Sequence, residues 1–188
     1  MGSSPPSKLS PQEVTDLHYQ TNFSKEEINE WYSMFLQESP KGQMCKEEFG
    51  QLYTRVFPEG TTGSFTNNVF RTFDKDSNGF IDFNEFIIGM GILSRGSYHQ
   101  KLAWVFSLYD IDDDGFITKS EMTEMIKAKL QMVGDTPESL PKDFKNCTPE
   151  AVSDKVFDQI DTDGDGQVTL SEFLDGVTKS PSLIALLH

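Results

Sequence analysis

Residues 161–172 read Asp161-Thr162-Asp163-Gly164-Asp165-Gly166-Gln167-Val168-Thr169-Leu170-Ser171-Glu172. Acidic side chains stand at positions 1, 3, 5 and 12 of this stretch, and position 6 is Gly166. A Ca²⁺ ion takes six to eight oxygen ligands, and a twelve-residue loop supplies them from positions 1, 3, 5, 7, 9 and 12. Gly166 has no Cβ and permits the sharp bend that such a loop requires. An acidic, solvated turn would not explain this spacing, so the stretch predicts a calcium-binding loop of the EF-hand type.

The same pattern occurs twice more, at residues 74–85 and 110–121. Both copies keep glycine at position 6 and glutamate at position 12. Positions 1, 3, 5, 7 and 12 of the three loops give the predicted metal ligands, which are Asp74, Asp76, Asn78, Phe80, Glu85, Asp110, Asp112, Asp114, Phe116, Glu121, Asp161, Asp163, Asp165, Gln167 and Glu172. Position 7 contributes its backbone carbonyl, and Thr169 at position 9 is expected to act through a water molecule. Three intact loops predict three bound Ca²⁺ ions.

A fourth copy, residues 37–48, is damaged. It keeps Gly42 at position 6 and Glu48 at position 12, but positions 1, 3 and 5 carry no acid. Position 5 is Lys41, whose ammonium would stand where the ion should be, and Pro40 restricts the backbone that must wrap the ion. We therefore predict that this loop binds no Ca²⁺ and serves as a structural partner for the second loop.

Apolar residues at helical spacing flank all four loops, as in the helix that carries Ile28, Trp31 and Phe35. The pattern predicts an all-α protein of four EF-hands in two pairs, with short β-bridges between paired loops at position 8. The interval before the last loop is longer, which indicates a linker over 133–148. The predicted organisation is a flexible N-terminal segment (1–8), an N-terminal pair (9–95), a C-terminal pair (96–180) and an apolar tail (181–188).

The composition is strongly acidic, with 30 Asp and Glu against 16 Lys and Arg and a net charge of −14. This charge argues against a nucleic-acid partner. Cys45 and Cys147 are too far apart in sequence to suggest a disulfide framework, so reduced thiols and a cytoplasmic location are expected. There is no apolar run of transmembrane length and no nucleophile–base constellation. We expect a protein that performs no chemistry itself.

The N-terminal pair is expected to expose an apolar groove when Ca²⁺ binds. Glu85 closes the second loop and also opens the following helix, so Phe86 and Ile87 should move with it. The candidate groove residues are Trp31, Phe35, Tyr53, Phe70, Phe73, Phe86 and Ile87. Such a groove would accept a target helix. Two alternatives remain open: that these residues are simply core, and that the tail residues 183–187 either fill a groove of their own protein or complete its packing.

Several short runs of residues indicate a narrower family than EF-hand proteins in general. They are the spoiled loop at Pro40-Lys41-Gly42, Phe86-Ile87-Ile88-Gly89, Leu93-Ser94-Arg95-Gly96, Lys101-Leu102-Ala103-Trp104-Val105-Phe106 and Gln131-Met132-Val133-Gly134. With these runs the chain resembles the neuronal calcium sensor family. The resemblance implies an N-terminal groove exposed by Ca²⁺ and reversible membrane association through an N-myristoyl group. Gly2 is present for that modification, but Pro6 stands where Ser or Thr is favoured, so an unmodified tail is the alternative.

Two other classes share the loop pattern. Regulatory subunits of the calcineurin B type usually keep a working first loop, which is absent here. Calcium-regulated photoproteins also have three working loops, but their dead loop is the second, and their chromophore cavity uses several histidines. This chain has three histidines, none near Trp31 or Trp104. The expected function is therefore that of a calcium sensor.

Overall fold

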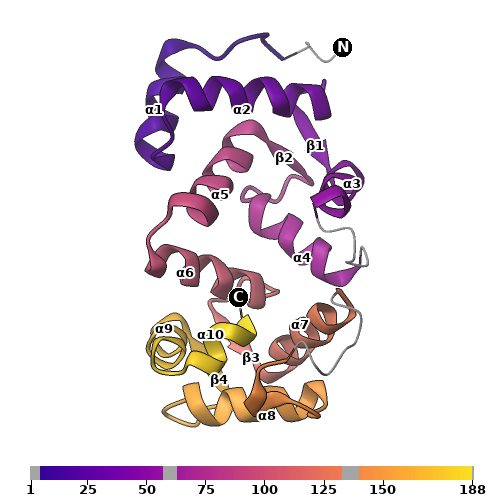
Figure 1. Cartoon of the computed structure of the whole chain (residues 1–188), viewed down its shortest axis with the longest axis vertical. Helices are drawn as coiled ribbons and strands as arrows, with labels where there is room; N and C mark the ends of the chain where they lie inside the picture. Colours follow the sequence, from indigo (N-terminus) through magenta and orange to yellow (C-terminus); the bar gives the residue numbers. More distant parts are fainter. Residues whose placement is uncertain (1–4, 57–62, 133–139, 188) are drawn as a thin grey trace. The chain divides into compact units, whose positions relative to one another are not determined.

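The computed structural model describes residues 5–56, 63–132 and 140–187 (Figure 1). The chain divides into two compact units. The first unit comprises Met1–Tyr53 and Val69–Lys101, and the second comprises Thr54–Asn68 and Leu102–His188. The elements up to residue 95 are α1 (Pro11–Thr21), α2 (Lys25–Glu38), β1 (Gln43–Cys45), α3 (Lys46–Val56), α4 (Ser64–Phe73), β2 (Phe80–Asp82) and α5 (Phe83–Arg95). Those that follow are α6 (Tyr98–Tyr109), β3 (Phe116–Thr118), α7 (Lys119–Met132), η2 (Lys142–Phe144), α8 (Pro149–Ile160), β4 (Gln167–Thr169), α9 (Leu170–Lys179) and α10 (Pro181–Leu187).

The first two helices begin at capping boxes, because each has a serine that accepts from the N3 amide while the N3 glutamate accepts from the serine amide. The pairs are Ser10 with Glu13 and Ser24 with Glu27. Helix α1 ends at Thr21. It stops where Asn22 adopts a left-handed conformation (φ 59°) and donates its amide to the carbonyl of His18 at 3.1 Å.

The predicted β-bridges are present, one for each pair of loops. Strand β1 of the damaged loop pairs antiparallel with β2, and Met44 lies opposite Ile81. Strand β3 pairs with β4, and Ile117 lies opposite Val168. All four of these side chains are buried. The position 8 side chains therefore join each pair of loops through a small apolar contact, and the fold is that of paired EF-hands.

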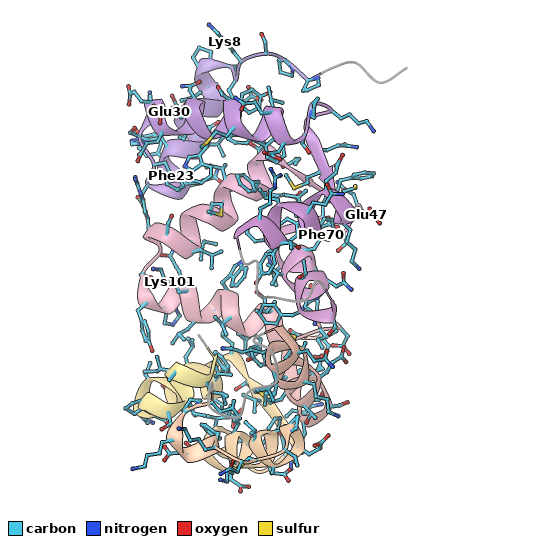
Figure 2. All side chains as sticks on the ribbon, turned by 45° about the vertical axis from the view of Figure 1, so that its right-hand side comes forward. Lys8, Phe23, Glu30, Glu47, Phe70 and Lys101 are labelled. Carbon is cyan, nitrogen blue, oxygen red and sulfur yellow. The ribbon has the colours of Figure 1, made fainter. Side chains whose placement is uncertain are left out.

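An aromatic cluster forms the core of the first unit. The ring of Phe86 on α5 lies 5.8 Å from Trp31, 5.3 Å from Phe35 and 6.4 Å from Phe73, measured between ring centroids. A Cβ on Gly89, one turn along α5, would come within 2.4 Å of the Phe73 ring. Only glycine therefore lets α5 approach this ring so closely. Figure 2 shows the side chains on the ribbon.

The N-terminal segment contacts the damaged loop of the same unit. Residues 5–8 form no helix or strand, but the hydroxyl of Tyr32 donates to the carbonyl of Pro6 at 2.7 Å. A Cβ on Gly42, which has φ of 77°, would lie 2.7 Å from the Cβ of Pro5. The described part of the segment is therefore held against α2 and the loop that follows it.

The second unit is built on α7, α8, α9 and α10 (Figure 1). Residues 133–139 of the predicted linker lie outside the described residues. The rest of that linker contributes two side chains to the core, because Phe144 of η2 is fully buried and Leu140 is 8% exposed. The apolar tail forms α10, which packs against α9 and buries Leu183 completely. This placement favours packing within the C-terminal half as the role of the tail.

Among the described residues, none of the helices has both the length and the apolar character needed to cross a bilayer.

Candidate metal centres

Three groups of carboxylates could each hold a metal ion. They are Asp74 with Asp76 and Glu85, Asp110 with Asp112 and Glu121, and Asp161 with Asp163 and Glu172. In each group one oxygen atom from every residue lies within 4.8 Å of the others. Like charges this close repel one another, and a divalent cation with a preference for oxygen would relieve the repulsion. Residues 37–48, all of which the structure describes, contain no such group.

The position 1 aspartates are oriented by the backbone of their own loops. The amide of the position 6 glycine donates to this aspartate in all three loops: Gly79 to Asp74 at 2.9 Å, Gly115 to Asp110 at 3.0 Å and Gly166 to Asp161 at 3.0 Å. These glycines have φ between 85° and 92°, a region that residues with a Cβ rarely adopt. The glycine thus both permits the bend and fixes the first ligand.

The position 12 glutamate is held by both of its carboxylate oxygens, as Glu121 shows. One oxygen accepts from the amides of Ile111 at 2.8 Å and Asp112 at 3.3 Å. The other accepts from the amide and the hydroxyl of Thr118 at 2.8 and 2.7 Å. Glu121 therefore lies across the loop and also completes the N-terminal cap of α7.

The other two loops repeat this arrangement. Glu85 accepts from the amides of Lys75 and Asp82 at 2.8 and 3.0 Å. Glu172 accepts from the amides of Thr162 and Thr169 at 3.0 Å each, and from both hydroxyls. The Thr169 hydroxyl also donates directly to Glu172, and its role at a bound ion through a water molecule stays a prediction. The signal for the direct bond was present in the sequence, since Thr-x-x-Glu before an apolar run is a capping-box pattern.

The position 5 side chains turn the chain toward position 7. Their oxygens accept from the position 7 amides: Asn78 from Phe80 at 2.8 Å, Asp114 from Phe116 at 2.9 Å and Asp165 from Gln167 at 2.8 Å. The three-carboxylate groups include positions 1, 3 and 12 and do not include Asp114 or Asp165. The structure thus gathers three carboxylates in each loop, while position 5 shapes the backbone that presents the position 7 carbonyl.

The protonation of these carboxylates follows from their surroundings. Burial raises the pKa of Asp110, which is 3% exposed, and the charges of Glu121 and Asp113 raise it further against the hydrogen bonds from Gly115 and Asp114. Burial acts in the same direction on Glu121, but hydrogen bonds from Thr118 and two loop amides outweigh it and lower its pKa. Hydrogen bonds led by the Thr169 amide lower the pKa of Glu172 to about 2. Glu121 and Glu172 are therefore ionised at neutral pH, as a calcium ligand must be.

The damaged loop has the same outline without the ligands. Gly42 makes the bend, and the carboxylate of Glu48 accepts from the amide of Cys45 at 2.9 Å, as a position 12 residue does in the intact loops. The hydroxyl of Ser39 donates to the carbonyl of Gln43 at 3.1 Å and closes the loop from within. Lys41 is exposed. This loop therefore keeps its shape through its own hydrogen bonds.

The predicted groove residues lie in the core of the first unit. Phe35, Phe70, Phe73, Phe86 and Ile87 are buried, and Trp31 and Tyr53 are half-buried. Trp31, Phe35 and Phe73 surround Phe86, whereas Phe70 contacts Phe49. Figure 2 labels Phe23 and Phe70, which are buried, and Glu30 and Glu47, which are exposed. Gly2, the predicted lipidation site, lies outside the described residues.

Comparisons with known proteins agree with this geometry. Residues 99–178 match the family model of the EF-hand domain pair, and residues 65–93 match that of the EF hand domain. S-modulin of Aquarana catesbeiana is 34% identical over 189 residues, covering 100% of this chain and 93% of that protein. Human recoverin is 33% identical and visinin of Gallus gallus is 34% identical, again over 100% of this chain and over 94% and 97% of those proteins.

Proposed function

The chain belongs to the neuronal calcium sensor family, and from this premise we propose that it binds three Ca²⁺ ions and signals by exposing apolar surface in its N-terminal half. It is a calcium-binding sensor protein and not an enzyme. The proposal concerns the number of Ca²⁺ ions, the residues that hold them and the apolar surface that Ca²⁺ exposes.

The hydrogen-bond pattern shared by the three intact loops carries the proposal. Positions 1, 3 and 12 bring three carboxylates within 4.8 Å in each loop, and backbone amides already orient two of the three. We assign the ions to the second, third and fourth loops, with the ligands predicted from positions 1, 3, 5, 7 and 12. Sensor loops of this type bind Ca²⁺ with dissociation constants on the order of 10⁻⁷ to 10⁻⁵ M. The ion would supply positive charge and no chemical step.

Glu85 connects the second loop to the aromatic cluster. Its carboxylate lies with those of Asp74 and Asp76, and the next residue along α5 is Phe86, whose ring contacts three other aromatic rings. Without a cation the three carboxylates repel one another. Glu85 is the member that stands on α5, so relief of the repulsion by moving Glu85 also moves Phe86. Ca²⁺ binding and the packing of the cluster are therefore coupled.

The finer features follow from the same reading. An amphipathic target helix would occupy the groove formed by the seven predicted groove residues, which are Trp31, Phe35, Tyr53, Phe70, Phe73, Phe86 and Ile87. The organisation into pairs 9–95 and 96–180 with a tail at 181–188 is retained as part of the proposal. A cytoplasmic location with reversible membrane association through Gly2 is proposed on the ground of the family alone. Nothing in the acidic composition favours nucleic acid as a partner.

The test measures Ca²⁺ stoichiometry together with the binding of a dye that fluoresces on apolar surface. We expect native mass spectrometry to show three ions, and dye fluorescence to rise when Ca²⁺ is added. Glu85→Gln removes one charge from the second loop and should abolish most of that rise. Glu47→Gln is the matched control, since Glu47 is exposed on α3 and belongs to no carboxylate group. A Glu85→Gln protein whose dye signal equals that of the control would refute the coupling, and a count other than three would refute the site assignment.

A further inference from the structure

A small open pocket lies in the second unit between α7, the segment before η2, and α10, with an enclosed volume of about 40 Å³ that widens into solvent. Six of its lining residues are apolar: Ile126, Leu130, Leu140, Pro141, Ala185 and Leu186. The seventh is Lys129, which lies on α7 between two of them. Pockets that bind small molecules have this kind of lining, mostly apolar with a few polar groups.

The ammonium of Lys129 has too few partners for its position. An ammonium carries three donors, and the one hydrogen bond of Lys129 within the described residues goes to the carbonyl of Leu186 at 2.6 Å. No carboxylate of the described residues forms an ion pair with it or raises its pKa by its charge. Burial in apolar surroundings lowers its pKa to about 8. This is a desolvated cation in a chain whose net charge is −14.

Two other lysines of the same helix show what Lys129 lacks. Lys119 pairs with Asp154 at 2.7 Å, and Lys127 pairs with Glu150 at 2.7 Å. Both of those ion pairs lie at the surface, where solvent also satisfies the ammonium. Lys129 has the greater need of an anion, because an unpaired charge removed from water raises the free energy of the folded state.

The pocket is complementary to one kind of ligand. A single cation matches a single negative charge, and the apolar walls match a hydrocarbon chain. Phosphate esters carry more charge and more acceptors than one ammonium can satisfy, and a cationic or neutral amphiphile would leave Lys129 unpaired. We infer that this pocket binds an aliphatic carboxylate of the fatty-acid type, with the carboxylate on the ammonium of Lys129 and the first carbons of the chain between α7 and α10. The inference is independent of the calcium loops.

Octanoate is the probe, titrated by calorimetry into the full chain saturated with Ca²⁺. We expect saturable binding of one octanoate per chain. Lys129→Met, which keeps the length of the side chain without its charge, should weaken binding by about tenfold or more. Lys127→Met is the matched control, since it removes an equal charge from the same helix outside the pocket, and should leave the affinity within about twofold. Acetate, which lacks the chain, and octyltrimethylammonium, which lacks the carboxylate, should not bind measurably.

A second measurement uses the unaltered chain, so that it does not depend on how the variant folds. The pKa of Lys129, followed by NMR of its ε-carbon, should be near 8 in the free protein and should rise by about one unit or more with octanoate. A value near 10.4 without ligand would overturn the inference. It would mean that the charged form of Lys129 already has a stabilising partner in the free protein. Equal octanoate binding by the Lys129→Met and Lys127→Met variants, or equal binding of the cationic amphiphile, would overturn it as well.

Discussion

Glu121→Gln isolates the contribution of one closing glutamate to calcium binding. The substitution keeps the shape of the side chain, removes its charge and replaces one carboxylate oxygen by an NH₂ group. In the structure both oxygens of Glu121 accept hydrogen bonds, one from Ile111 and Asp112 and the other from Thr118. Whichever way the new amide is turned, its NH₂ group must therefore face N–H donors of the backbone instead of an acceptor.

The magnitude has two parts. Without Ca²⁺, lost hydrogen bonds at one end of the side chain would cost about 1–3 kcal/mol. Removing one of three charges that lie within 4.8 Å offsets part of this cost. The ion-free stability should therefore change by less than about 2 kcal/mol. With Ca²⁺, the third loop loses a charged oxygen ligand, for which charge-assisted contacts suggest about 2–3 kcal/mol. That corresponds to a loss of roughly 30- to 150-fold in affinity.

The assay is a competitive titration against a chromophoric chelator at pH 7 and physiological ionic strength. Glu124→Gln is the matched control, because Glu124 is exposed on the same helix and belongs to no carboxylate group. Its charge is screened by salt at this ionic strength, so its three sites should stay within about twofold of the unaltered protein. In the Glu121→Gln protein the third site should weaken as stated. The fourth should weaken by a few-fold, since Ile117 and Val168 join the two loops.

The reasoning is refuted if Glu121→Gln weakens calcium binding no more than Glu124→Gln does. It is also refuted if the second loop loses as much affinity as the third. The first result would show that Glu121 serves only as the cap of α7, and the second would show that the substitution disrupts the whole fold.

Three further outcomes are expected. Lys41→Asp should not create a fourth tight site, because it corrects one position of a loop that lacks acids at positions 1 and 3; native mass spectrometry that counts four ions in this variant would contradict the account of the damaged loop. Lys129→Met should stabilise the protein below pH 8, since the folded state lowers the pKa of Lys129 from 10.5 to about 8 and so disfavours its charged form. The gain in unfolding free energy, about 1–3 kcal/mol measured in urea, should fade as the pH rises from 8 to 10.5. A gain that is independent of pH would exclude the charge of Lys129 as its cause. Leu183→Ala should lower the unfolding free energy by about 2–5 kcal/mol because Leu183 is fully buried, while Leu93→Ala at an exposed position should change it by less than about 0.5 kcal/mol; similar losses for the two would mean that α10 does not pack as described.

The calcium loops were the most predictable part of this chain, because the residues that determine the conformation of such a loop all lie within its twelve positions. Gly166 bends the chain and also orients Asp161, and both effects depend on neighbours within the same loop. The pairing of Met44 with Ile81 was predictable for a related reason, since position 8 of any such loop faces its partner. Capping boxes such as Ser10 with Glu13 are equally local.

Features that depend on distant parts of the chain were harder to predict. Phe144 stands in a Gly- and Pro-bearing stretch with no helical spacing, and nothing nearby in sequence indicates that other elements of the second unit bury it completely. The same limit applies to Lys129, whose environment is created by Leu140 and α10. In sequence it looks like one more solvated lysine on the surface of a helix. The contact between Pro5 and Gly42 joins residues with no pattern in common.

That last contact makes the damaged loop part of what holds the N-terminal segment. A Cβ at position 42 would lie 2.7 Å from the Cβ of Pro5, so Pro5 can keep its place only while position 42 is glycine. The next residue, Pro6, is held through its carbonyl by the hydroxyl of Tyr32 on α2. A change in the conformation of this loop would therefore shift Pro5, and with it the direction in which the chain enters the first unit.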